Sequence, residues 1–320
     1  MTLDALKTWG LEIGRKAPFW TQGPGSNISW KEASGPMRDP LLWIKASGRR
    51  LDEMDQRGAL GRVPLRQASE FFSAGVKFAA QAEERYAEFL ASCASPEHGF
   101  GRPSMETSLH VVLPQPFVAH FHSLAAILMA EHDEATVREI TTNAGLSPAV
   151  IVPPVLPGWK LGVAIQPLAH ETNVLLLRTH GVVVAVTNTS DFARWDACED
   201  EFLRRFALHE LITVKKADDG YRRAREVVAN GWYPMKHYMP DVAVFRERLL
   251  RVLERSSGDG TVRYRLRPTA EVIDRDMVEL WLAIVLLYRA NLDLSELPED
   301  VVTTVADLPV ERARRDIVRD

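Results

Sequence analysis

Short apolar runs that alternate with stretches of helical spacing restrict the possible folds of this chain more than any other feature. Apolar residues recur every three or four positions over residues 64–92 and 192–208, which is the spacing of an amphipathic helix. Strands and helices interleaved across residues 1–215 predict an α/β or α+β domain. Four runs have the length and composition of buried strands: Leu41–Ile44, Pro116–His122, Val174–Arg178 and Val182–Val186.

Capping residues mark where further helices begin. A short amphipathic helix is expected over residues 1–16. Ser104 is placed to cap a helix over Met105–Val112, and another runs from Ser123 to about Glu131. Ser190 or Asp191 caps the helix over residues 192–208.

The character of the sequence changes after Asp219-Gly220. Residues 221–320 look mostly helical and are rich in Arg and Glu, with a loop expected at Ser256–Gly260. Neither a linker composition nor an internal repeat separates the two parts. We therefore expect a main domain over residues 1–215 and a mainly helical C-terminal extension over residues 216–320, which is an added layer and not an independent domain.

Composition and charge exclude several classes of protein. The 320 residues carry a net charge of −4, which gives no basic footprint for nucleic acid. The longest apolar run, Leu280–Tyr288, is far shorter than the ~20 residues that cross a bilayer. Cys93 and Cys198 are too few for a secreted disulfide framework, and no signal peptide is visible. We expect a soluble, cytoplasmic protein with no nucleic-acid or membrane partner.

Two histidines two positions apart, His120 and His122, are the first candidates for a functional site. Side chains on a strand alternate between faces, so both imidazoles point to the same side and can converge on one ion. His180, beside Gly181 at the end of another apolar strand, is a third candidate. The alternative is structural, with two half-buried histidines beside a core strand and a turn residue next to a glycine.

Glu106 is the fourth candidate, because it falls in the first turn of the helix expected over Met105–Val112. A carboxylate there interacts favourably with the helix dipole, and that alone would explain it. Three neutral imidazoles and one carboxylate nevertheless suit a zinc-like divalent ion, and the carboxylate could leave the ion and act as a base.

Three segments rich in small residues could bind an anion. Gly23–Ser29 and Lys45–Gly48 place backbone N–H groups and hydroxyls at sharp turns, and Ser104 lies at a helix N-terminus. Together they could form a nest for a phosphate or carboxylate, although each one alone is better explained as an ordinary turn. The sequence has no P-loop and no Gly-x-Gly-x-x-Gly, so nucleotide chemistry has no support.

Taken in order along the chain, these motifs resemble those of the class II aldolase/adducin family. Within the family, residues 42–48 and 117–122 are similar to the aldolase half of proteins that fuse a rhamnulose-phosphate aldolase to a dehydrogenase. Five motifs over about residues 20–215 carry the resemblance: Ser26-Asn27-Ile28-Ser29, Ala46-Ser47-Gly48, Pro103-Ser104-Met105-Glu106, His120-Phe121-His122 and His180-Gly181.

The resemblance implies a three-layer αβα domain with a central, mostly antiparallel sheet. It implies that zinc or another divalent metal is held by His120, His122 and His180. Glu106 would be the fourth ligand and the catalytic acid/base. The residues implied for binding a phosphate or another anion are Asn27, Ser29, Ser47, Gly48 and Ser104.

The implied activity is reversible aldol cleavage of a sugar phosphate or a related hydroxy-keto compound through a metal-stabilised enediolate, which needs no Schiff-base lysine. Two alternatives stay open: a family epimerase or decarboxylase with the same metal site, and a non-catalytic scaffold such as the adducin branch, which lacks the metal histidines. The family also implies a homo-oligomer, commonly a tetramer, whose neighbouring subunit supplies a tyrosine. Tyr233 and Tyr238 are candidates by position only.

Two departures from the family pattern fall on the expected anion site. Ser26 stands where many members have a glycine, and Met105 stands where many have a second hydroxyl. Both leave the expected metal ligands unchanged. The identity of the substrate is therefore open, because a smaller or differently charged group than phosphate could occupy that site.

Overall fold

A seven-stranded sheet forms the centre of the chain, whose computed structural model describes residues 3–32, 39–74, 81–290 and 292–308. The spatial order of the strands is β3-β2-β1-β4-β7-β6-β5. Neighbours pair antiparallel, except that β5 runs parallel to β6. The strands are β1 (Asn27–Glu32), β2 (Leu41–Lys45), β3 (Leu60–Pro64), β4 (Phe117–Phe121), β5 (Val150–Val152), β6 (Val174–Leu177) and β7 (Gly181–Val186).

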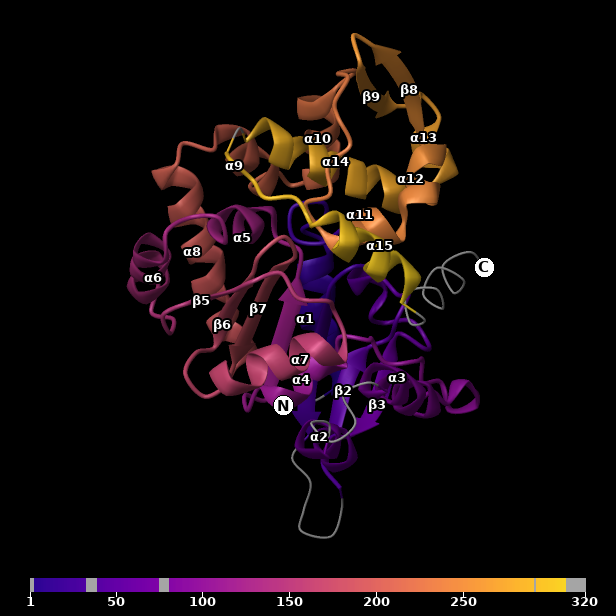
Figure 1. The fold of residues 1–320 in the computed structure, drawn as a ribbon. Coiled ribbons are helices and arrows are strands. Elements are labelled where there is room, and N and C mark those ends of the chain that lie inside the picture. Colours follow the sequence, from indigo (N-terminus) through magenta and orange to yellow (C-terminus); the bar gives the residue numbers. More distant parts are fainter. Residues whose placement is uncertain (1–2, 33–38, 75–80, 291, 309–320) are drawn as a thin grey trace.

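Helices cover both faces of this sheet (Figure 1). One face packs against α1 (Leu3–Gly14), α5 (Leu124–Met129), α6 (Glu134–Asn143) and α8 (Phe192–Arg205). The other packs against α2 (Leu65–Ala74), α3 (Ala82–Ser92), α4 (Thr107–Val112) and α7 (Trp159–Ile165). Short 3-10 helices join these elements: η1 (Leu51–Glu53), η3 (Pro96–His98), η4 (Gln166–Leu168) and η5 (Thr189–Asp191). The three-layer αβα fold with a mostly antiparallel sheet is confirmed.

Alternation along β4 decides which layer each of its side chains enters. Phe117, Ala119 and Phe121 pack into the core beside α1, α5 and α8, whereas Val118 enters the opposite core beside α4 and α7. His120 shares the face of Val118 because side chains two apart point the same way. This parity places the first histidine of the His-x-His motif in the layer that contains α4.

The expected strands correspond to β2, β4, β6 and β7. The expected helix over residues 64–92 corresponds to α2 and α3, and residues 75–80 lie outside the described part. The helix expected over Met105–Val112 begins at Thr107, and its N-cap is Glu106. The expectation that Ser104 caps it is therefore wrong: the Ser104 carbonyl accepts a hydrogen bond from the Thr107 amide at 3.1 Å, which forms a turn before the helix.

The C-terminal part is mainly helical, as expected, and it carries one hairpin that was not expected. Helix α9 (His209–Lys215) ends just before this part, whose own helices are α10 (Gly220–Val228), α11 (Pro240–Val244), α12 (Arg246–Arg251), α13 (Ala270–Ile273), α14 (Arg275–Arg289) and α15 (Glu299–Asp307). The hairpin pairs β8 (Leu253–Gly258) with β9 (Thr261–Leu266), so the loop expected at residues 256–260 is partly strand. Most of β8 is exposed and polar, which removes the apolar alternation that signals a strand.

Helix α14 joins the two parts of the chain through one continuous core. Its residues 277–287 are buried in the same hydrophobic cluster as α1, α5 and α8. Figure 1 shows the C-terminal helices above one end of the sheet. The expected boundary near residue 215 stays a prediction.

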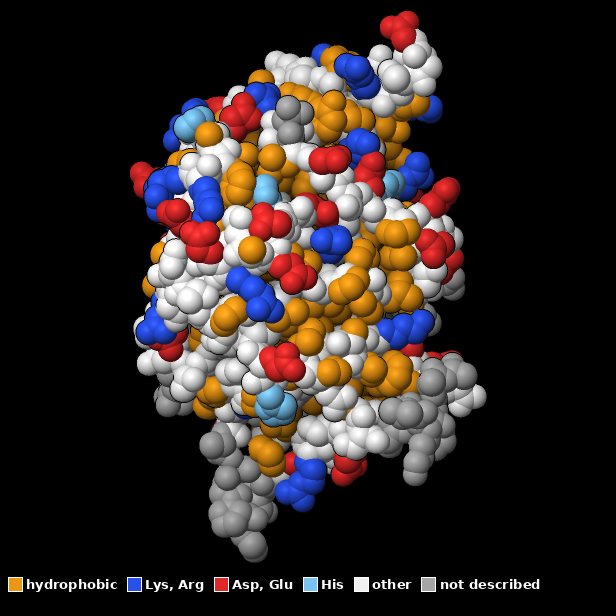
Figure 2. Space-filling view, turned by 60° about the vertical axis from the view of Figure 1, so that its left-hand side comes forward, with side chains coloured by type: hydrophobic (Ala, Val, Ile, Leu, Met, Phe, Trp, Pro, Cys, Tyr) orange, Lys and Arg blue, Asp and Glu red, His pale blue; other side chains and the backbone are white. Residues whose placement is uncertain are grey.

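Charged side chains of both signs are interspersed over the face shown in Figure 2. This distribution agrees with the small net charge of −4. Among the described residues, no helix combines the length and the apolar character needed to cross a membrane.

Candidate metal centre

Two neighbouring strands and one helix start bring the candidate ligands together. His120 lies in β4 and His122 directly follows it, while His180 lies in the turn between β6 and β7. Strand β7 pairs with β4, with Phe121 opposite Val182. The β6–β7 turn therefore lies beside the end of β4. Glu106 reaches the same place from the start of α4.

Gly181 allows the turn to approach β4 this closely. A Cβ atom on Gly181 would lie 2.4 Å from the Phe121 carbonyl oxygen and 3.0 Å from the His122 Cα, and the residue has a φ of 153°. Both features require the absence of a side chain. The glycine of the His180-Gly181 motif thus serves the packing that places His180 beside His122.

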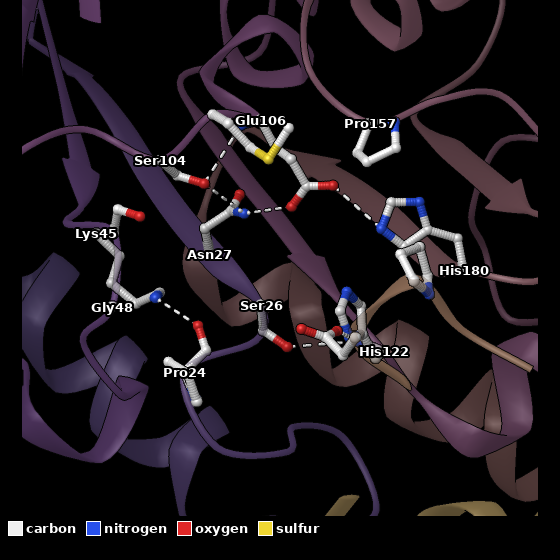
Figure 3. A pocket seen from close by; sticks show the side chains of 14 residues that line it. Pro24, Ser26, Asn27, Lys45, Gly48, Ser104, Glu106, His122, Pro157 and His180 are labelled. Atoms are coloured by element: carbon white, nitrogen blue, oxygen red, sulfur yellow. Dashed lines mark hydrogen bonds and ion pairs between the residues drawn. The ribbon is translucent and has the colours of Figure 1, made fainter. Parts of the chain in front are cut away.

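The four side chains converge on one point. Glu106, His120, His122 and His180 each offer a ligand atom, and these atoms all lie within 4.8 Å of one another. His180 Nε2 lies 3.1 Å from Glu106 Oε1, and His120 Nε2 lies 3.4 Å from Glu106 Oε2. All four residues are buried. Figure 3 shows Glu106, His122 and His180 facing one another across the pocket.

One hydrogen bond identifies the free nitrogen of His120. Its Nδ1 lies 3.0 Å from the Val182 carbonyl oxygen. A carbonyl can only accept, so Nδ1 carries the hydrogen and the Nε2 lone pair is left pointing at the cluster. This is the tautomer that a metal ligand needs.

The residues present fit a divalent metal. Among the described residues, no hydrogen-bond partner exists for the buried atoms His120 Nε2, His122 Nε2 and Glu106 Oε1. Buried polar atoms are rarely left in this state. Three imidazoles and one carboxylate are also the donor types that bind zinc and similar ions. The cluster therefore has the donor atoms of a metal site, and several of these atoms lack any other partner.

Burial and mutual interaction shift the protonation of the cluster. Burial alone would raise the pKa of Glu106, but His120 and His180 outweigh it and hold that pKa well below its usual range. Burial lowers the pKa of His180 to about 4. For His120 the effect of burial is exceeded by the neighbouring Glu106 carboxylate, which raises its pKa. An ionised Glu106 and a neutral His180 are the forms that bind a metal.

A chain of buried polar groups orients Glu106 from behind. Burial holds the pKa of His110 well below its usual range, so this imidazole is neutral. Its Nε2 contacts the Asn27 side-chain oxygen, and its Nδ1 lies 2.7 Å from the Ser29 hydroxyl. With its oxygen engaged, Asn27 turns Nδ2 to Glu106 Oε2, at 3.0 Å. Asn27 therefore fixes one oxygen of the carboxylate.

The pocket contains most of the residues expected to bind an anion, but not Ser29. Ser29 is fully buried behind Asn27 and contacts His110. Lys45 donates to the carbonyl oxygens of Pro24 at 3.1 Å and Arg49 at 2.5 Å. The pocket lining is Pro24, Ser26, Asn27, Lys45, Ser47, Gly48, Ser104, Met105, Glu106, His122, Pro157, His180, Pro240 and Asp241.

Sequence reasoning missed Asp241, a pocket residue of the C-terminal part. It lies in α11, is 3% exposed, and places Oδ2 2.7 Å from His122 Nδ1. A single aspartate in a helical region carries no local signal of such a role. The two tyrosines considered for the site are not in the pocket lining: Tyr233 donates to the Val228 carbonyl, and Tyr238 is buried.

Comparison with known proteins identifies the class of this fold. The family model described as the Class II Aldolase and Adducin N-terminal domain matches residues 15–207, which is more than half of the chain. The protein therefore belongs to the class II aldolase/adducin family.

Individual relatives are distant. The uncharacterized oxidoreductase YuxG of Bacillus subtilis (strain 168) is 29% identical over 170 residues, which make up 50% of this chain and 23% of that protein. This chain thus matches about a quarter of the length of that relative. Similarity to an aldolase half of a longer fused protein stays a prediction.

Solved structures show a similar fold. The N-terminal class II aldolase domain of a conserved protein from Thermoplasma acidophilum is 21% identical, with a TM-score of 0.50 over 64% of this chain and 93% of that chain. L-fuculose-1-phosphate aldolase from Thermus thermophilus is 14% identical, with a TM-score of 0.43 over 66% of this chain and 98% of that chain.

Proposed function

We propose that this protein is a metal-dependent class II aldolase that reversibly cleaves a sugar phosphate or a related hydroxy-keto compound. The observation that carries the proposal is the buried Glu106–His120–His122–His180 cluster, three of whose members, Glu106, His122 and His180, line a pocket, in a chain of this family. The proposed metal is zinc or another divalent ion. His120, His122 and His180 would hold it, with Glu106 as the exchangeable fourth ligand.

A divalent ion in this cluster would supply Lewis-acid polarisation of a substrate carbonyl oxygen. Glu106 would move the proton: its carboxylate would take the proton of the substrate hydroxyl, whose carbon becomes the carbonyl carbon of one product as the carbon–carbon bond breaks. The electron pair of that bond stays on the carbon next to the original carbonyl, and this carbon then takes the proton from the Glu106 carboxyl group. In the reverse direction the carboxylate removes the same proton. The hydrogen bond from Asn27 Nδ2 to Oε2 holds the carboxylate in place while Oε1 stays available.

The polar wall of the pocket would bind the far end of the substrate. Ser47, Gly48 and Ser104 line it with hydroxyl and backbone groups, which can bind an anion without a cationic side chain. The ammonium group of Lys45 is directed to backbone carbonyl oxygens of the surrounding loops. These contacts support a role for Lys45 in holding the loops in place. A Schiff-base lysine is not required, because the metal would polarise the substrate carbonyl.

One feature of the pocket favours a second candidate reaction. Met105 contributes an apolar side chain to the pocket where many family members have a hydroxyl. A substrate without phosphate would fit such a wall, and an epimerase or decarboxylase could use the same cluster. Analysis of products separates the three: an aldolase yields two carbonyl compounds, an epimerase conserves the carbon count, and a decarboxylase releases CO2.

The central experiment is metal content together with aldol cleavage, in protein purified without added metal. Wild type should contain close to one divalent ion per chain and should cleave a member of a panel of ketose 1-phosphates and hydroxy-keto acids, with activity lost on chelation. His122→Ala should lose both the ion and the activity. The control is His98→Ala, an exposed histidine on η3, which should retain both.

The outcomes discriminate between the hypotheses. No bound metal in wild type after reconstitution would overturn the aldolase proposal and favour a scaffold. We also propose that the protein is cytoplasmic and forms a homo-oligomer. Light scattering of the purified protein checks the oligomeric state, with a tetramer as the expected result.

A further inference from the structure

Asp241 is the polar side chain that the C-terminal part contributes to the pocket. It comes from α11, far along the chain from the strands that carry the histidines. Its side chain is 4% exposed, and the His122 side chain is 3% exposed. Burying a carboxylate this deeply is costly unless a polar partner close to its oxygens stabilises it. One such partner is His122, whose Nδ1 lies 2.7 Å from Asp241 Oδ2.

The packing of α11 holds Asp241 firmly in place. Met239 and Val242, which flank it in the chain, are both fully buried. The Asp241 carbonyl accepts a hydrogen bond from the Phe245 amide at 2.9 Å. A side chain on such a rigid element can set the orientation of a neighbour more accurately than one on a mobile loop.

The two histidines of the His-x-His motif each have an oxygen beside Nδ1. His120 Nδ1 makes a hydrogen bond with the Val182 carbonyl oxygen, which leaves Nε2 for the cluster. His122 Nδ1 lies 2.7 Å from Asp241 Oδ2, an ion-pair contact without the angles of a hydrogen bond, and its Nε2 makes no hydrogen bond among the described residues. Metal-binding histidines usually donate their second ring nitrogen to a carboxylate or a carbonyl, which fixes the tautomer and raises the basicity of the ligand.

We propose that Asp241 is a positioning residue for the metal centre: it accepts the Nδ1–H of His122 and thereby presents the Nε2 lone pair to the ion. Asp241 itself stands outside the four converging ligand atoms, so it acts through His122. The C-terminal part of the chain thus completes the metal site that the αβα domain carries. This inference rests on one part of the proposed function, that the cluster binds a divalent ion, and does not depend on the reaction.

The test measures metal affinity, with the spectrum of bound cobalt as a second readout. Affinity for Zn²⁺ and Co²⁺ is determined by competition with a chromophoric chelator, for wild type, Asp241→Ala and Asp241→Asn. Asp241→Ala should lose about 10- to 100-fold in affinity and shift the cobalt absorption bands. Asp241→Asn keeps an acceptor oxygen without the charge, so it should recover part of the loss.

A matched control separates positioning from general destabilisation. Asp274 is another largely buried aspartate of the C-terminal part, which caps α14 and pairs with Arg248. Asp274→Asn should lower stability but keep wild-type metal affinity and cobalt spectrum. If Asp241→Ala does not fold, Asp241→Asn decides the question, because the proposal requires the charge as well as the acceptor.

Wild-type affinity and spectrum in a folded Asp241 variant would overturn the inference and leave the proposed function standing. Weakened metal binding in the variants of a protein that shows no aldol cleavage would support the inference and contradict the proposed reaction. A wild-type protein that binds neither Zn²⁺ nor Co²⁺ would overturn both.

Discussion

Two of the polar clusters among the described residues are built around a buried carboxylate, and they differ in how the atoms of that carboxylate are satisfied. The metal cluster consists of Glu106, His120, His122 and His180. The second, which we call the Lys215 cluster, consists of Lys215, Glu199, Asp196 and Asp200. Both contain a carboxylate that is buried in the αβα domain, so burial alone does not tell them apart.

In the Lys215 cluster both oxygens of the buried carboxylate are hydrogen-bonded. Glu199 Oε1 accepts from the Trp195 indole at 3.0 Å and from the Ser123 hydroxyl. Its Oε2 accepts from the Trp20 indole at 2.6 Å and lies 3.3 Å from the Lys215 ammonium. In the metal cluster, Glu106 Oε1 and three imidazole nitrogens, His120 Nε2 and both ring nitrogens of His122, make no hydrogen bond to any described residue. The contrast therefore lies between the two buried carboxylates: a carboxylate whose oxygens are both hydrogen-bonded serves the fold, whereas one with an unpartnered oxygen among unpartnered imidazole nitrogens is suited to bind a ligand.

The largest expected effect is on kcat, which should depend on the Glu106 carboxylate but not on the Glu199 carboxylate. Glu106→Gln should lower kcat about 100- to 10,000-fold, because an amide cannot transfer the proton, while metal content stays near wild type. Glu199→Gln should reduce stability and leave kcat of the folded protein near wild type. Steady-state kinetics with parallel metal analysis checks both. Near-normal turnover of Glu106→Gln would remove the acid/base role.

A second substitution removes the ammonium group from the Lys215 cluster. Burial raises the pKa of Glu199 even though Lys215 opposes the shift, so the carboxylate depends on the ammonium group. Lys215→Met should lower the free energy of unfolding by about 3–5 kcal/mol, since it leaves an uncompensated buried charge. Denaturant titration measures the loss. The double variant with Glu199→Gln should regain part of it, and no recovery would argue against charge as the cause.

Removal of the ion from the metal cluster should lower the stability of the folded protein. A ligand that binds only the folded state stabilises it by about 2.7 kcal/mol at one hundred times its Kd. Chelation should therefore lower the melting temperature of wild type but not of His122→Ala. Lys215→Met should keep the metal-dependent increment although its baseline is lower. Equal increments in wild type and His122→Ala would place the bound ion elsewhere.

The smallest expected effect is a pH dependence of stability that arises at His132, near the Lys215 cluster. His132 makes an edge-on ring contact with Phe202 and a tilted one with Phe206, in the segment that carries Glu199. Burial lowers the pKa of His132, with Asp133 opposing. The folded state then binds fewer protons than the unfolded state below the ordinary pKa, so stability falls as pH drops through about 6.5. His132→Gln should make this decline shallower. Unfolding titrations of both proteins at about pH 7.5 and 5.5 test it, and identical slopes would contradict it.

Local patterns were sufficient for much of the fold. Apolar runs predicted β2, β4, β6 and β7, and helical spacing predicted α1, α5 and α8. The three strands of the seven-stranded sheet that were not predicted, β1, β3 and β5, lack such a pattern. Strand β5 has only three residues, and β1 carries polar side chains at its half-buried far end. Their place depends on pairing with neighbours, which periodicity along one segment does not contain.

The sequence by itself pointed to the members of the metal cluster: period-two alternation puts His120 and His122 on one face, and the family resemblance added His180 and Glu106. Only the tertiary structure decided which polar residues support it. Ser29 lies behind Asn27 against His110, and Asp241 arrives from α11. These contacts join segments far apart in the chain, and sheet register and helix packing set them. The physical reason is that side-chain direction is local, whereas side-chain convergence depends on the whole fold.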